Sequence, residues 1–178
     1  MSLLLIESPT LALERAEVDA LVARIHPAVT DGDAEVVEAR VTADLKRLFI
    51  VVETPHAAEA ASESLRAALA AADVEVEDVA PVRLVGADLD EVRAAAAQGP
   101  RYLVEWDLPE DLTMEAYLER KKAKSPLYAE VPEVAFRRTY VREDLDKCLC
   151  FYDAPCVEDV ERAREVVSAP VDRLHELA

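Results

Sequence analysis

Glycine, cysteine and tryptophan are scarce in this sequence of 178 residues. Its three glycines, at positions 32, 86 and 99, lie far apart, so the chain has no glycine-rich phosphate loop and no nucleotide cofactor is expected. Its three cysteines all lie between Cys148 and Cys156, which is not the pattern of a disulfide framework. The motifs Gly-x-Ser-x-Gly, His-Glu-x-x-His and Cys-x-x-Cys are absent too, so no motif identifies a reaction.

Basic residues are also few. The 20 Lys and Arg residues stand against 37 Asp and Glu, which gives a formal net charge of −17. Such a charge opposes sequence-independent binding to nucleic acid or to anionic lipid, so neither is expected as a partner. The one basic run, Arg120–Lys124, falls at the end of a predicted helix, where cations interact favourably with the helix dipole. We interpret it as a helix end rather than as a phosphate-binding patch.

Long apolar segments are missing as well. No stretch approaches the roughly 18 apolar residues that a membrane-spanning helix needs. The segment Met1–Ile6 has neither the basic region nor the cleavage site of a signal peptide. These features predict a cytoplasmic protein with no membrane partner.

The sequence does contain an internal repeat. When Pro55 is aligned with Pro155, the residues Val41, Asp44 and Leu45 fall on the same residue types 100 positions later. The second half therefore reads as an altered copy of the first. A repeat of this length indicates two fused domains rather than a solenoid.

Both halves show the same alternation of strand and helix patterns. Runs of apolar and alternating residues predict the strands, and apolar residues three and four positions apart predict the helices. The order strand-helix-strand-strand-helix-strand is that of a ferredoxin-like βαββαβ unit. The predicted strands are Leu3–Glu7, Glu35–Ala43, Lys46–Glu53, Val74–Val85, Arg101–Asp107, Val134–Arg142, Lys147–Asp153 and Val171–Leu177, and the predicted helices are Leu13–His26, Thr54–Asp73, one from Thr113, and Pro155–Ser168.

This order predicts an α+β fold. We expect a tandem duplication of ferredoxin-like units, packed sheet to sheet as a fused pseudo-dimer of the dimeric α+β barrel type. The predicted parts are copy one at residues 1–86, a linker helix at 87–100 and copy two at 101–178. The chain would then be a monomer that acts as a pseudo-dimer, with a homodimer as the open alternative.

Four segments of the second half carry a resemblance to a known family. Tyr102–Glu105, Arg138–Asp144, Cys148–Pro155 and Ala169–Leu174 resemble a small bacterial domain that is catalogued as a domain of unknown function. Described members are nickel-binding, ferredoxin-like and dimeric. The resemblance covers residues 101–178, whereas the first half fits only in outline. It implies nickel or another divalent transition metal as a cofactor.

The donors for such a metal are sparse. The resemblance implies histidine ligands near the first strand of the domain, where this chain has Glu105, Trp106 and Asp107. Late transition metals prefer imidazole, thiolate or mixed donors, so nickel binding is predicted to be weak or absent. If a metal binds, the candidate ligands are Glu105, Asp107, His175 and Cys150.

The cysteines allow more than one interpretation. Cys148 and Cys150 share one face of a predicted strand, because side chains alternate along a strand. Two thiolates on one face could form half of a soft-metal site, but a place in the core is the favoured interpretation. Cys156 falls at a predicted helix N-terminus, where an exposed thiol is expected to have a lowered pKa.

Glu105 is predicted near the middle of its sheet, where a carboxylate needs a partner or a ligand. Its candidate partners are Arg138, Tyr140 and Arg40, and an ion pair across the seam of the two halves is favoured over a ligand site. Phe136 is expected on the same strand face as Arg138 and Tyr140. Any ligand is expected to bind mainly in the second half, where the candidate ligand-binding residues are Glu105, Trp106, Arg138, Tyr140 and Tyr152.

Three classes of function remain open. The resemblance favours a non-enzymatic protein that binds a small ligand or a metal ion. The first alternative is a cofactor-independent α+β barrel enzyme or small-molecule sensor that uses a cavity between the two sheets. The second alternative is a scaffold or interaction module, since a fold alone does not decide function.

Overall fold

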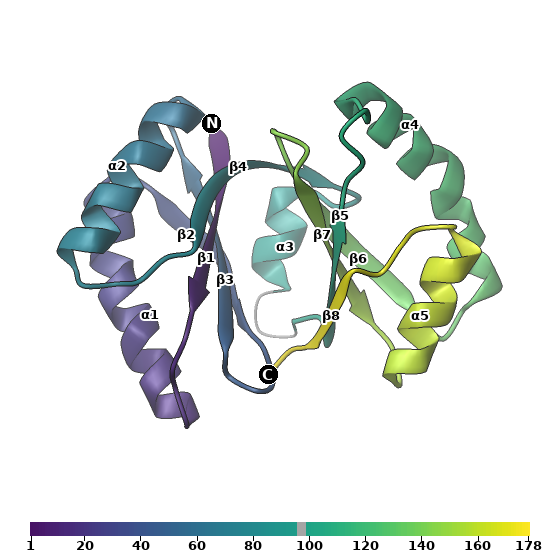
Figure 1. Cartoon of the computed structure of the whole chain (residues 1–178), viewed down its shortest axis with the longest axis horizontal. Coiled ribbons are helices and arrows are strands. Elements are labelled where there is room, and N and C mark those ends of the chain that lie inside the picture. The colour runs from purple at the N-terminus through teal and green to yellow at the C-terminus, as the bar shows by residue number, and fades with distance from the viewer. Residues whose placement is uncertain (96–98) are drawn as a thin grey trace. The chain divides into compact units, whose positions relative to one another are not determined.

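The computed structural model describes residues 1–95 and 99–178, which form two compact units (Figure 1). Each unit combines helices with an antiparallel sheet, so the predicted α+β class is confirmed. Strand β4 passes from the first unit into the second at Val82. The first unit contains Met1–Val82, the helix α3 and Ala178, and the second contains Arg83–Asp88 and the chain from Gly99 to Leu177.

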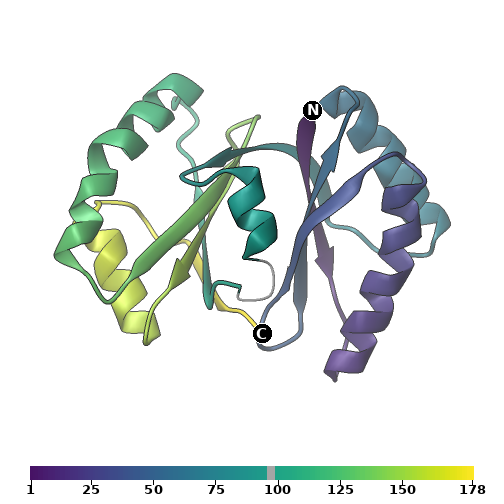
Figure 2. The same ribbon diagram turned by 180° about the vertical axis from the view of Figure 1, so that it is seen from behind.

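In the first unit two helices cover one face of the sheet (Figure 1). The strand order is β2-β3-β1-β4, that of a ferredoxin-like unit. The short helix α3 lies beside β2, as the view from behind shows (Figure 2). Arg93 of α3 forms an ion pair with Glu53 of β3 at 2.6 Å. The elements are β1 (Ser2–Pro9), α1 (Arg15–Thr30), β2 (Glu35–Val41), β3 (Arg47–Thr54), α2 (Ala58–Ala71), β4 (Asp78–Val85) and α3 (Leu89–Ala94).

The second unit repeats this arrangement with the strand order β6-β7-β5-β8. Its helices α4 and α5 pack on one face, and a 3₁₀ helix, η1, extends α4. Thr113 caps α4 by accepting a hydrogen bond from Ala116 N at 3.2 Å. The elements are β5 (Tyr102–Asp107), α4 (Met114–Lys124), η1 (Ser125–Glu130), β6 (Ala135–Arg142), β7 (Lys147–Asp153), α5 (Val157–Val166) and β8 (Arg173–Glu176).

The two units share their irregularities as well as their order. Leu45 and Leu145 both adopt a left-handed backbone, with φ of 60° and 61°, in the tight hairpins that join β2 to β3 and β6 to β7. The register slips once in each β-ladder, between Val36 and Glu38 and between Phe136 and Arg138. These features recur 100 residues apart, so positions in the two units can be compared one by one.

Helix α1 differs from its prediction. We expect a helix that ends at His26, because Pro27 lacks an N–H donor and crowds the preceding turn. The helix instead continues to Thr30. Ala28 and Val29 are both buried against the core, and burial of this last turn outweighs the local cost of the proline.

The bulge in β6 also changes one prediction. We expect Phe136 on the same face as Arg138 and Tyr140, but the extra residue in the strand reverses its side. Phe136 pairs with Tyr152 on the helix-covered face and stacks on Tyr128, with the ring centroids 5.3 Å apart. The prediction was wrong because side chains alternate between the two faces only along a strand without a bulge.

Candidate functional site

The second unit presents two sets of polar side chains on opposite faces of its sheet. Glu105, Arg138 and Tyr140 lie on the face that the helices do not cover, whereas Trp106 and Tyr152 lie on the helix-covered face. The predicted ligand-binding set is therefore divided between the two faces. The physical reason is strand alternation, which places the neighbours Glu105 and Trp106 on opposite sides.

Glu105 is fully buried on the face without helices, and three basic side chains hold it. Its carboxylate lies 2.9 Å from Lys147 Nζ, 2.8 Å from His175 Nε2 and 3.3 Å from Arg173 Nε. Glu105 is thus ion-paired within the second unit, by residues that we did not name as its partners, and the favoured ion pair across the seam of the two halves stays a prediction. Arg173 also donates to Asp107 at 2.9 Å.

The same contacts decide how well this cluster fits nickel. The hydrogen bond from Arg173 lowers the pKa of Asp107, and the bond to Asp107 raises the pKa of Arg173. Both carboxylates are therefore committed to fixed cations that would repel a metal ion. Cys150, the fourth candidate ligand, lies on the opposite face of the sheet. Among residues 1–95 and 99–178, no group of three His, Cys, Asp or Glu side chains could hold a metal. The residues do not fit nickel.

We accordingly expect no tight nickel site. Isothermal calorimetry of protein prepared without a histidine tag should show no saturable, stoichiometric heat when Ni²⁺ is added. The cations of Lys147 and Arg173 are the physical reason, since a bound dication would have to displace them from Glu105. A stoichiometric Ni²⁺ site in tag-free protein would contradict this reading of the cluster.

The helix-covered face holds a polar network inside an otherwise apolar core. Arg164 of α5 is buried, and its Nη1 donates to Tyr152 Oη at 3.2 Å and to Cys150 Sγ at 3.3 Å. Its Nε donates to the Pro170 carbonyl at 3.2 Å. Tyr152 Oη and Tyr128 Oη lie 2.8 Å apart. A guanidinium thus links β7, α5 and η1 inside the core.

Cys150 is the electrostatic centre of this network. Besides the bond from Arg164, its sulfur accepts from Thr139 Oγ1 at 3.2 Å and lies 3.8 Å from Cys148 Sγ. The bond from Cys148, together with the cations of Lys121 and Arg164, holds the pKa of Cys150 well below its usual value despite its burial. The same bond and burial raise the pKa of Cys148. Cys150 is therefore the more acidic thiol of the pair.

The pKa of Cys156 differs from its prediction. A backbone hydrogen bond at Asp159 lowers its pKa, but the acidic side chains of Glu158 and Asp159 outweigh that effect, and the pKa is raised. Its thiol donates to Asp159 Oδ2 at 3.2 Å. The prediction of a lowered pKa fails because two acidic residues occupy the first turn of α5.

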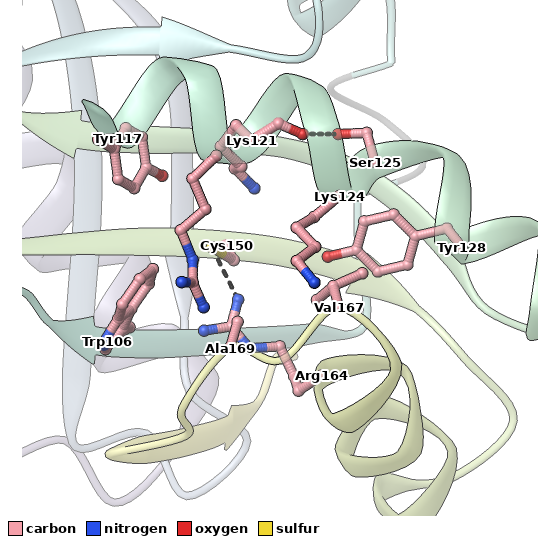
Figure 3. Close-up of a pocket in the computed structure, with 11 residues that line it drawn as sticks. Trp106, Tyr117, Lys121, Lys124, Ser125, Tyr128, Cys150, Arg164, Val167 and Ala169 are labelled. Carbon is pink, nitrogen blue, oxygen red and sulfur yellow. Dashed lines mark hydrogen bonds between the residues drawn. The ribbon is translucent and has the colours of Figure 1, made fainter. Parts of the chain in front are cut away.

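A small cavity opens beside Cys150, between α4 and α5 (Figure 3). Its free volume of about 20 Å³ accommodates about one water molecule. The side-chain ends of Lys121, Lys124 and Tyr128 turn into this space in Figure 3. We call it the α4–α5 pocket. Its lining residues are Trp106, Tyr117, Arg120, Lys121, Lys124, Ser125, Tyr128, Cys150, Arg164, Val167 and Ala169.

Tyr117 lines the α4–α5 pocket with an unusual hydroxyl. The side chain is 1% exposed, and its Oη makes no hydrogen bond of good geometry within the described parts of the chain, although Cys148 and Thr139 lie close enough to affect its pKa. Burial raises its pKa, so the hydroxyl keeps its proton. A buried hydroxyl without a partner costs free energy, roughly 1–3 kcal/mol, which a bound water or ligand would recover.

The first unit has wider hollows without such a network. One of about 500 Å³ between α1 and α2 is lined largely by alanines, and one of about 570 Å³ lies near Thr10 and Glu75. Both are more open to solvent than the α4–α5 pocket. No buried charged side chain lines either one.

Sequence reasoning missed most of the α4–α5 pocket. It named Trp106, Tyr152 and Cys150 but interpreted the basic run as a helix end and did not single out Arg164. A signal was present, since Val160, Ala163, Arg164 and Val167 recur at the spacing of a buried helix face. A charged residue on an apolar stripe is a reason to expect a buried network.

Comparison with known proteins agrees with the resemblance of the second half. Residues 102–177 match the family model described as nickel responsive protein SCO4226-like. A search of curated proteins gives no match. No helix in the described residues is both long and apolar enough to cross a membrane.

Two solved structures share the fold over nearly the whole chain. TA0507, described as a chlorite dismutase, aligns with a TM-score of 0.55 and 11% identity, covering 99% of this chain and 94% of its own. The siroheme decarboxylase NirDL aligns with a TM-score of 0.51 and 13% identity, covering 98% of this chain and 70% of its own. At such identities the likeness shows the fold and not the chemistry.

Proposed function

We propose that this protein is a non-enzymatic small-ligand-binding protein whose site is the α4–α5 pocket of the second unit. The observation that carries the proposal is the polar network around Arg164, which stands where the first unit has only aliphatic side chains. Leu48, Ile50 and Val52 of β3 occupy the register positions of Cys148, Cys150 and Tyr152 of β7.

The position of Arg164 has its own counterpart. Helix α2 ends with a left-handed Asp73 and a bond from Val74 N to Leu69 O, as α5 ends with a left-handed Ser168 and a bond from Ala169 N to Arg164 O. Leu69 is therefore the counterpart of Arg164, and both are buried.

This comparison indicates that the fold itself does not require the buried polar network. The first unit builds the same core from Leu48, Ile50, Val52 and Leu69, so the architecture has no need of a buried guanidinium. Burying a charge costs free energy even when it is paired, and an apolar replacement is often neutral or stabilising. A costly network beside a cavity is typical of a binding site.

Several groups in the pocket favour binding over catalysis. Burial raises the pKa of Tyr128 to about 12 and also raises those of Tyr117 and Tyr152. These phenols keep their protons at neutral pH, as does Arg164, so they donate hydrogen bonds rather than abstract protons. The nickel role that the family description suggests is not part of the proposal, because the described residues of the second unit provide no suitable set of donors.

We also propose that the two units descend from one duplicated domain. The shared bulges, left-handed leucines and helix ends, all at matching positions, support this origin. Glu7 and Arg47, 3.2 Å apart, further mirror Glu105 and Lys147. In this account the second unit keeps the binding network and the first has lost it.

The test fills the α4–α5 pocket without changing a charge. Thermal shift over a panel of neutral and charged metabolites should identify a ligand of the wild type, and Ala169→Leu should abolish its effect, because Ala169 lines the small cavity. The matched control is Ala123→Leu on the exposed side of α4. A ligand that stabilises the Ala169→Leu and wild-type proteins equally would place binding elsewhere.

A further inference from the structure

We propose that the α4–α5 pocket selects a compact oxyanion, such as a carboxylate, phosphate or sulfate group. The inference rests on the proposed function and adds the chemical class of the ligand. Its first support is charge. Four cationic side chains and no carboxylate line the pocket among the described residues, in a chain whose net charge is −17.

The cations come from two helices. Arg120, Lys121 and Lys124 lie on α4, and Arg164 lies on α5. None of the three on α4 forms an ion pair with a carboxylate in the part of the chain that the structure describes. The helix dipole favours cations at a helix C-terminus, but it favours them equally when they extend into solvent. The Nζ of Lys121 lies over the Phe136 ring, 4.1 Å from its centroid, but the dipole does not explain why Lys124 turns into the pocket that holds a buried arginine (Figure 3).

The direction of the hydrogen bonds is the second support. Arg164 can only donate, so its bond to Tyr152 uses one lone pair of the Tyr152 oxygen. We infer that Tyr152 in turn donates in its 2.8 Å bond with Tyr128, which leaves the proton of Tyr128 to point into the pocket. Its pKa of about 12 keeps that proton in place at neutral pH. The hydroxyl of Tyr117 is a second donor without an acceptor.

Cys150 does not change the sign of the net charge that lines the pocket. Even as a thiolate, Cys150 would bring one negative charge against four positive ones, and its sulfur already accepts from Arg164 and Thr139. Arg120 already donates to the Ser168 carbonyl and Lys121 lies over the Phe136 ring, whereas Lys124 and the hydroxyls of Tyr117 and Tyr128 offer donors to the pocket. A ligand rich in oxygen lone pairs and carrying negative charge suits these donors and cations.

The size of the cavity limits the ligand further. A free volume of about 20 Å³ accommodates about one water-sized group, so an oxyanion would place one oxygen in the cavity and its other atoms toward the opening. Arg120 and Ser125 are exposed and Lys124 is half-buried, so a larger molecule could extend outward past them. The bound group is then either a free ion or the charged end of a larger molecule.

Trp106 provides the readout, since it is the chain's single tryptophan and lines the pocket. Arg120 and Arg164 lie over its ring, at 5.5 Å and 5.8 Å from the centroid. An anion that pairs with these guanidinium groups should change the indole fluorescence. At constant ionic strength, we would titrate tag-free protein with phosphate, sulfate, acetate and glycerol phosphate, and with acetamide as the neutral counterpart of acetate.

We expect saturable binding of at least one anion and none of acetamide. Glycerol phosphate binding more tightly than phosphate would identify the charged end of a larger molecule, and the reverse order a free ion. Lys124→Gln and Tyr128→Phe should each weaken binding by about tenfold, because each removes a donor to a charged group. The matched control is Lys122→Gln, which makes the same charge change on the exposed side of α4 and should have no effect.

Two results would overturn the inference. Acetamide binding as well as acetate would show that charge is not selected, and equal losses in the Lys122→Gln and Lys124→Gln variants would show only diffuse attraction. If the metabolite panel finds a neutral ligand that Ala169→Leu blocks, the oxyanion inference fails while the proposed site stands. If no compound binds to the wild type in either experiment, both fail.

Discussion

Arg164→Leu should lower the free energy of unfolding by about 3 kcal/mol, although leucine is the residue at the equivalent position of the first unit. The reason is that the substitution removes the guanidinium donor from two buried acceptors, Cys150 Sγ and Tyr152 Oη, and from the Pro170 carbonyl. Urea denaturation followed by circular dichroism measures the loss.

The control for this prediction changes both partners. Cys150→Ile together with Arg164→Leu copies Ile50 and Leu69 of the first unit, and it removes the Cys150 sulfur along with the guanidinium. The double variant should therefore be more stable than Arg164→Leu alone, so the two effects should not add. Simple additivity, or a loss below about 1 kcal/mol for Arg164→Leu, would show that the network carries no energetic weight.

Glu105→Gln should cost a similar amount, about 3 kcal/mol, because it leaves the cations of Lys147 and Arg173 beside a neutral amide in a buried position. The same denaturation experiment measures it. Asp107→Asn is the matched control. Both side chains of the Asp107–Arg173 pair are partly exposed, at 54% and 37%, so its loss should cost no more than about 1 kcal/mol.

The pH dependence of that control pair has a definite sign. Arg173 holds the pKa of Asp107 below its usual range, so the stability that the pair contributes is present at neutral pH and is lost as the pH falls through the folded-state pKa.

A Glu105→Gln variant as stable as the wild type would contradict the prediction for Glu105, because it would mean that Lys147 and Arg173 find other partners at no cost.

The fold was predictable from the sequence because its determinants are local. Alternating strands, a leucine in each tight hairpin and apolar helix faces recur in both halves, and the structure places the elements in the expected order. Where prediction failed, tertiary packing decided. Burial of Ala28 and Val29 carries α1 past Pro27, and a single bulge turns Phe136 to the other face. The packing of the two sheets on each other stays a prediction.

The candidate site was predictable only in part. Trp106, Cys150 and Tyr152 were named, yet they were grouped with Glu105, which strand alternation places on the opposite face. The rest of the α4–α5 pocket depends on how two helices pack, so Tyr117, Lys124 and Arg164 meet only in three dimensions. Their convergence cannot be read from spacing along the chain, because the residues lie on separate elements.

The most direct test of the central claim is residue-resolved NMR of tag-free protein titrated first with phosphate and then, separately, with Ni²⁺. The account predicts that phosphate shifts the Trp106 indole signal and the amides of Lys121, Lys124 and Cys150, and that Ni²⁺ leaves the amides of Glu105 and His175 unchanged. Saturable Ni²⁺-dependent changes at Glu105 and His175, with no phosphate-dependent change around Trp106, would contradict it and return the function to the face that the helices leave uncovered.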